Sequence, residues 1–131
     1  MSLSLRPFQP YHLALIPSLA PLWSAPLACA VGRYTAFSGF DEDGIVGAAG
    51  VAAYDELGLV AWAAFTDRLP RHLKAVLQAC RLVLDAEPEP VTALVDPAAA
   101  NADKAKRFAE VLGFNPDGTE QGYLRYRRMR P

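Results

Sequence analysis

Cysteine and histidine are scarce in this sequence of 131 residues, with two of each. Cys29 and Cys80 are too few for a disulfide framework and stand at no metal-binding spacing, so both are expected to be small buried apolar residues. His12 and His72 have no cysteine or carboxylate beside them at the spacing of metal ligands. The sequence therefore predicts neither a disulfide scaffold nor a metal site.

The chain also lacks an excess of charge and a long apolar run. Its formal net charge of −1 argues against a surface built to bind nucleic acid. Four prolines interrupt the apolar N-terminal stretch, so no run reaches the ~18 residues of a membrane span and no signal peptide is recognisable. These absences predict a soluble cytoplasmic protein without membrane or nucleic-acid partners, or one carried in a particle.

What is present is enough apolar material for a core, since hydrophobic residues make up 52% of the chain. No repeat or linker divides it, so residues 1–131 are expected to form a single domain. Alternating apolar residues predict a short strand at 3–8, and Pro10 opens a helical stretch with Leu13, Ile16 and Leu19 on one face. Three strands of an antiparallel meander follow at 34–40, 45–54 and 59–66, separated by turn signals at 41–44 and 55–58.

The clearest element is a helix after the third meander strand, because apolar residues recur there with helical spacing. They are Leu69, Leu73, Val76, Leu77, Cys80, Val83 and Leu84. A buried strand, Val91 to Val95, comes next. Strand 59–66, the helix and strand 91–95 form a βαβ unit, whose crossover makes the two strands parallel.

The last part of the chain predicts a second helix and a hairpin. Asn101 is a plausible N-cap for a helix to Leu112, and Gly113 stands where a left-handed residue ends it. A strand from Phe114, a turn at 116–118 and a basic edge strand at 122–128 complete the pattern. The fold class is α/β (α+β): a mixed sheet with an antiparallel meander, one parallel crossover and helices on both faces.

The stretch VTALVDPAAANADKAKRFAEVLGF, residues 91–114, together with this order of elements, resembles the GNAT family of acetyl-CoA-dependent N-acetyltransferases. The chain is most similar to small divergent members encoded by phages and prophages. The resemblance implies that acetyl-CoA lies in a cleft between strands 59–66 and 91–95. Its pantetheine would pass Ala63, Ala64 and Phe65, and its pyrophosphate would lie near Arg68, Arg71 and His72.

The sequence departs from the family at the implied phosphate loop, which contains no glycine and in which Pro70 lacks a backbone donor. Arg68, Arg71, His72 and Lys74 nevertheless crowd the start of the helix, where cations are disfavoured unless an anion binds. Two interpretations stay open. Either a phosphate-bearing ligand binds there, or Asp67 caps the helix and the cations point into solvent.

A second departure concerns proton transfer. Where many family members carry a tyrosine that protonates the leaving thiolate, this chain has Ala109. Tyr123 is a candidate substitute, and the available carboxylates, Asp67, Asp55 and Glu56, have turn or cap roles that explain them. Catalytic residues are therefore not assigned.

Two hypotheses follow from the resemblance. The first is acetyl transfer from acetyl-CoA to an unknown amine acceptor. The alternative is a catalytically inactive GNAT-fold structural or binding protein, such as a phage virion component that contacts other virion proteins. Whether the chain is an enzyme, which amine accepts the group and whether it forms a homo-oligomer all stay open.

Overall fold

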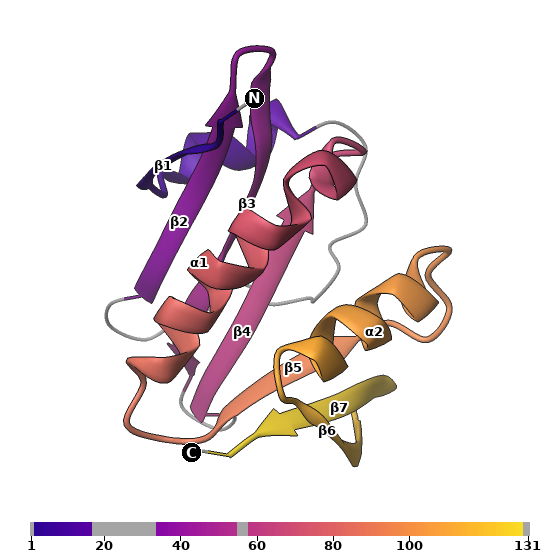
Figure 1. Ribbon diagram of the computed structural model, residues 1–131. Coiled ribbons are helices and arrows are strands. Elements are labelled where there is room, and N and C mark those ends of the chain that lie inside the picture. The colour runs from indigo at the N-terminus through magenta and orange to yellow at the C-terminus, as the bar shows by residue number, and fades with distance from the viewer. Residues whose placement is uncertain (1, 17–33, 55–57, 130–131) are drawn as a thin grey trace.

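The computed structural model describes residues 2–16, 34–54 and 58–129, which form one seven-stranded sheet with its helices (Figure 1). The strands are β1 (Ser4–Pro7), β2 (Tyr34–Asp41), β3 (Gly44–Tyr54), β4 (Gly58–Phe65), β5 (Val91–Val95), β6 (Asn115–Glu120) and β7 (Tyr123–Arg128). The helices are the 3-10 helices η1 (Pro10–Leu15) and η3 (Leu69–His72) and the α-helices α1 (Leu73–Asp85) and α2 (Ala102–Val111). The predicted positions Leu19 and Cys29 lie outside the described residues.

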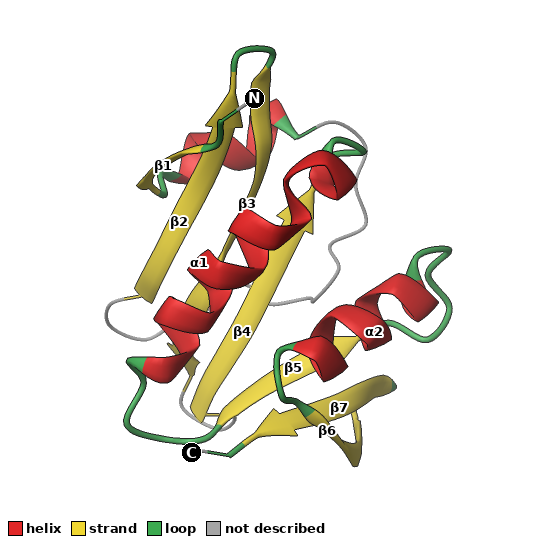
Figure 2. Ribbon diagram, in the orientation of Figure 1, coloured by secondary structure: helices red, strands yellow, loops and turns green. Residues whose placement is uncertain are grey.

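The sheet has the strand order β1-β2-β3-β4-β5-β7-β6. Neighbouring strands are antiparallel except β4 and β5, which the crossover through α1 makes parallel. Figure 2 shows α1 and α2 over one face of the sheet and η1 behind the other. The predicted fold class and element order are confirmed. No helix in the described ranges is long and apolar enough to cross a membrane.

Strand β4 is buried on both faces, as its continuous apolar run predicts. Because successive side chains of a strand point to opposite faces, β4 contributes to two separate clusters. Ala61, Ala63 and Phe65 pack in the core beneath α1 and α2. Trp62 and Ala64 pack on the other face, in a cluster that includes Phe8 and Ile16.

Helix α1 starts later than its apolar spacing predicts, because Pro70 lies in a preceding 3-10 turn. Val76, Cys80 and Leu84 are buried as expected. Leu73 is not, since 42% of it is exposed. Burial raises the pKa of the Cys80 thiol to about 12, so this cysteine is a thiol rather than a thiolate at neutral pH.

The C-terminal hairpin differs from its prediction in two ways. The turn predicted at 116–118 is wrong, because β6 runs through it with an irregularity between Pro116 and Thr119. The chain reverses instead at Gln121 and Gly122, which both have positive φ (50° and 86°). The predicted edge position of the last strand is also wrong, because β7 lies between β5 and β6.

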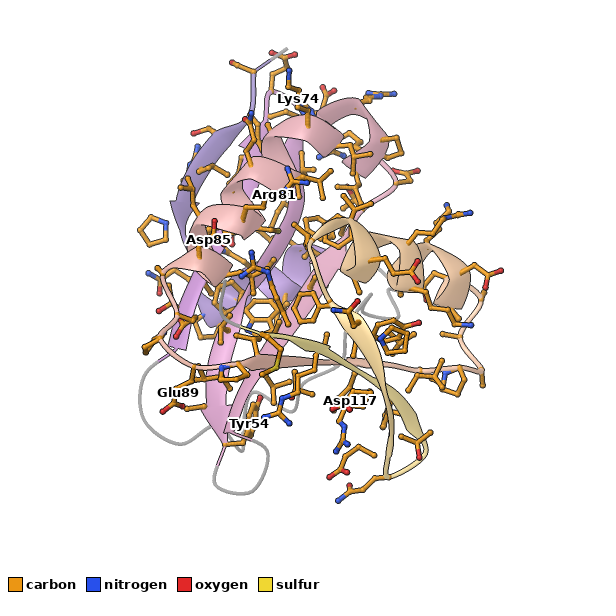
Figure 3. The ribbon with its side chains drawn as sticks, turned by 60° about the horizontal axis from the view of Figure 1, so that its bottom comes forward. Tyr54, Lys74, Arg81, Asp85, Glu89 and Asp117 are labelled. Atoms are coloured by element: carbon orange, nitrogen blue, oxygen red, sulfur yellow. The ribbon has the colours of Figure 1, made fainter. Side chains whose placement is uncertain are left out.

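Two arginines join the C-terminal ends of α1 and α2. Arg128 of β7 donates from Nε to the Leu112 carbonyl at 2.7 Å and pairs with Asp85 at the end of α1. Arg81 of α1 donates to the Val111 carbonyl at 3.4 Å. Figure 3 labels Arg81 and Asp85 along α1. Both arginines supply positive charge and donors where a helix terminus has unpaired carbonyls.

Candidate functional site

Strands β4 and β5 pair over a short stretch only and then separate. Their parallel ladder runs from Leu59↔Val91 to Ala61↔Ala93. Beyond it, β4 continues along β3 as far as Phe65, while β5 continues along β7. Figure 1 shows the two strands diverging from a common base. The backbone groups of Trp62–Phe65 that are turned toward β5 therefore have no partner strand on that side.

A pocket of about 460 Å³ lies beside this divergence, between α1 and α2. Its wall comprises the end of β4, the following loop and the facing sides of the two helices. The lining residues are Phe65, Thr66, Asp67, Leu69, Pro70, Leu73, Leu77, Lys104, Arg107, Phe108 and Val111. Most are apolar, and the volume is in the range of small-molecule sites.

The three β4 residues that the resemblance places along the pantetheine arm, Ala63, Ala64 and Phe65, lie in different surroundings in the structure. Phe65 lines the pocket, and its ring packs against Phe108 with the centroids 5.7 Å apart. Ala63 is buried beneath it on the same face, and Ala64 lies on the opposite face. Trp62 also lies on that opposite face and is not among the pocket's lining residues.

Two of the four cations at the start of α1, Arg68 and His72, have an anion already, and the protein supplies it. The side chain of Asp41, at the end of β2, is inaccessible to solvent, and its Oδ2 lies 3.2 Å from Arg68 Nε and 3.0 Å from His72 Nε2. Arg68 also donates to the Ile45 carbonyl. Of the predicted phosphate contacts, only Arg71 is exposed, and it does not line the pocket. Asp67 lines the pocket and makes no side-chain cap to η3 or α1.

The charge of Asp41 is stabilised where it lies. Burial alone would raise its pKa, but the hydrogen bond with His72, the Asp43 N–H and the Arg68 guanidinium together hold the pKa below the ordinary 3.8. The loop is fixed further by Thr66, whose N–H and hydroxyl both donate to the Val46 carbonyl. The segment from Thr66 to His72 is therefore anchored to the β2–β3 hairpin by side chains.

Asp41→Asn is expected to lower the unfolding temperature at neutral pH and to remove part of the acid sensitivity. Because the folded-state pKa is lowered, the stabilisation is complete above 3.8 and is lost as the pH falls through the folded-state value. The difference between wild type and variant should therefore narrow below pH 3.8. Thermal unfolding across pH measures it, with Glu42→Gln in the same turn as control. A difference that stays constant with pH would contradict the expectation.

No sequence pattern singled out two basic residues of the pocket. Lys104 and Arg107 line it from α2, three residues apart and therefore on one side of the helix. They flank the buried stripe of that helix, where charged residues normally face solvent. Helical spacing alone could have placed them together, but only the position of α1 shows what they face.

The proton-transfer candidates are not gathered at the pocket. Tyr123 pairs with Glu120 beside the hairpin turn and is not among the lining residues. Ala109 is fully buried in the core, where its methyl side chain leaves no hydrogen-bonding group without a partner. Asp55 and Glu56 lie outside the described residues. Among the residues that are described, no group of three or more histidine, cysteine or acidic side chains could hold a metal ion.

Known structures share this fold. An acetyltransferase from Agrobacterium tumefaciens superposes with a TM-score of 0.65 at 16% identity, over 98% of this chain and 91% of that one. Aminoglycoside acetyltransferase AAC(6')-Ib, solved with coenzyme A and kanamycin, gives 0.63 at 17% identity, over 98% and 95%. A protein from Desulfovibrio desulfuricans assigned to the GNAT acetyltransferases gives 0.57 at 16% identity, over 98% and 99%. This chain has the GNAT fold.

The likeness to GNAT structures extends over nearly the whole chain, including the diverging strands. No family model matches the sequence, and no curated protein matches it either. The similarity is thus one of fold, at sequence identities below a fifth. The phage origin and the virion role stay predictions.

Proposed function

We propose that this protein transfers an acetyl group from acetyl-CoA to an amine. The observation that carries the proposal is the separation of β4 and β5 beside an apolar pocket, in a fold shared with acetyltransferases. One of those neighbours was solved with coenzyme A and an amine-bearing aminoglycoside. The ligand chemistry fits, because the pantetheine arm is an extended chain with amide groups and few charges.

The pantetheine arm would lie along the free side of β4. There the unpaired backbone groups of Trp62–Phe65 can hydrogen-bond its amides, as a neighbouring strand would. Phe65, Leu73 and Leu77 would cover its apolar carbons from the sheet and from α1. Ala63 and Ala64 would contribute through their backbone, since their side chains are buried on either face.

The chemistry asked of the protein is mainly positioning. The amine nitrogen attacks the thioester carbonyl carbon, the carbon–sulfur bond then breaks, and coenzyme A leaves as a thiolate that takes up a proton. The amine loses one proton in the same reaction, so the protons balance. Holding the two reactants together replaces a bimolecular encounter with an intramolecular step. The proposal assigns the pocket residues to binding and leaves Tyr123 as a candidate acid only.

The direct test is calorimetric titration of the protein with coenzyme A and acetyl-CoA. A thiol-release assay with a panel of amines, including an aminoglycoside, follows. Saturable binding of both thioester and free thiol, together with amine-dependent thiol release, is the expected result. Absence of heat and of any thermal shift at millimolar ligand would refute the proposal.

Leu73→Trp should weaken coenzyme A binding by about tenfold, which corresponds to ~1.4 kcal/mol. Leu73 lines the pocket and is partly exposed, so the larger ring can enter the pocket without disturbing the core. Leu82→Trp is the matched control, because Leu82 lies on the same helix, is 74% exposed and does not line the pocket. Equal affinities of the two variants would show that the ligand binds elsewhere.

A further inference from the structure

The loop that follows β4 has few donors left for a phosphate. The N–H groups of Leu69 and Arg71 donate to the carbonyls of Thr66 and Arg68, at 3.2 and 3.1 Å. The Arg68 N–H donates to the Thr66 hydroxyl at 3.3 Å, and Pro70 has no N–H. Three backbone donors of the loop before α1 are therefore already occupied within the loop, and a fourth is missing at Pro70.

Two of the three side-chain cations of the same loop are occupied too, and the third, Arg71, is exposed but does not line the pocket. Arg68 and His72 both contact the buried Asp41 carboxylate, and only 21% and 3% of their side chains are exposed. A phosphate approaching them would meet a negative charge about 3 Å behind the cations, which reduces their attraction for it. Arg68 and His72 thus fix the loop to β2, and they do not present free positive charge to the pocket.

The opposite wall of the pocket does present positive charge. Lys104 and Arg107 are both exposed and line the pocket from α2. Among the lining residues, Asp67 is the one carboxylate, so the pocket carries two positive charges against one negative. Lys106 does not line it and instead lies 3.9 Å from Asp103. The two lining cations lie next to the apolar surface formed by Leu73, Phe108 and Val111 and their neighbours.

We propose that Lys104 and Arg107 form the phosphate-binding wall of this pocket, in place of the loop before α1. The inference rests on the proposed function, because it assigns the anionic end of the same acyl donor. The ligand class is a pantetheine arm that ends in phosphate, with its apolar part along α1 and its phosphates against α2. An ammonium and a guanidinium suit phosphate oxygens, to which both donate charge-assisted hydrogen bonds.

The test compares ligands that share the arm and differ in phosphate. The Lys104→Gln/Arg107→Gln variant is titrated with coenzyme A and with pantetheine, beside wild type. Coenzyme A affinity should fall by about tenfold or more, while pantetheine affinity and the unfolding temperature stay as in wild type. The wild-type affinity for coenzyme A should fall with added salt, and that dependence should be weaker in the variant.

Two controls separate the possible causes. Lys106→Gln removes a cation from the same helix outside the pocket and should leave coenzyme A affinity unchanged. Arg68→Gln should lower the unfolding temperature and weaken both ligands alike, because it loosens the loop. A selective loss of coenzyme A in Arg68→Gln, or wild-type affinity in the double variant, would overturn the inference and leave the proposed function intact. If wild type binds neither ligand, both fail.

Discussion

A Gly50→Ala variant is expected to lose about 3 kcal/mol of unfolding free energy, because the added methyl group has no space. A Cβ atom at Gly50 would lie 2.4 Å from the Thr35 carbonyl oxygen and 2.4 Å from the Ala36 Cβ. Gly50 is paired with Ala36 across β2 and β3, so backbone atoms would have to move. Chemical denaturation measures the loss.

Gly39→Ala is the matched control on the neighbouring strand. The three atoms nearest to a Cβ atom there belong to the side chain of Leu3, the closest at 3.1 Å, and Leu3 can adjust. Its effect should therefore be small, within about 0.5 kcal/mol. Equal unfolding free energies of the two variants would contradict the close approach of β2 and β3 at Gly50.

Phe108→Ala should cost about 4 kcal/mol of stability and also weaken coenzyme A binding. Phe108 is only 7% exposed and packs against Phe65, so its removal leaves a cavity where the core meets the pocket. Thermal and chemical unfolding give the first effect, and calorimetric titration gives the second. Phe108 belongs to both the core and the pocket wall, so its removal affects both stability and coenzyme A binding.

Val111→Ala separates those two effects. Val111 lies on the same helix and lines the same pocket, but it is 54% exposed. Its truncation should change stability by no more than about 0.5 kcal/mol. Equal destabilisation by the two variants would contradict the central position of Phe108.

The order of the elements could be predicted from sequence because its signals are local. The apolar run at 59–66 and the spacing of Val76, Cys80 and Leu84 each identify an element without knowledge of its neighbours. The turn of the C-terminal hairpin was predicted wrongly for the same reason, because that prediction also rested on a local signal. Pro116 to Gly118 carries a strong local turn signal, but pairing of β6 with β7 continues past it, and the actual turn uses Gln121 and Gly122.

The candidate site was harder to predict from the sequence, because the residues that form it are far apart in the chain. Asp41 lies 27 and 31 residues from Arg68 and His72, and nothing in its own turn marks it as their partner. Of the four cations crowded at the start of α1, these two contact this side chain of the protein, while the other two are exposed. The proposed binding of phosphate by Lys104 and Arg107 could be inferred only from the structure, because it depends on α1 lying across the pocket from them.

The contacts of Arg128 and Arg81 lie at one end of the two helices that enclose the pocket. They join α2 to α1 and β7 at the C-terminal ends of both helices, near the base from which β4 and β5 diverge. The N-terminal part of α2, with Lys104, lies away from these contacts, as Figure 1 shows for the helix as a whole. The two helices are therefore tied to each other at the end where Val111 lines the pocket. Under the proposed function, we expect the acyl donor to enter from the other end of the pocket, away from these contacts.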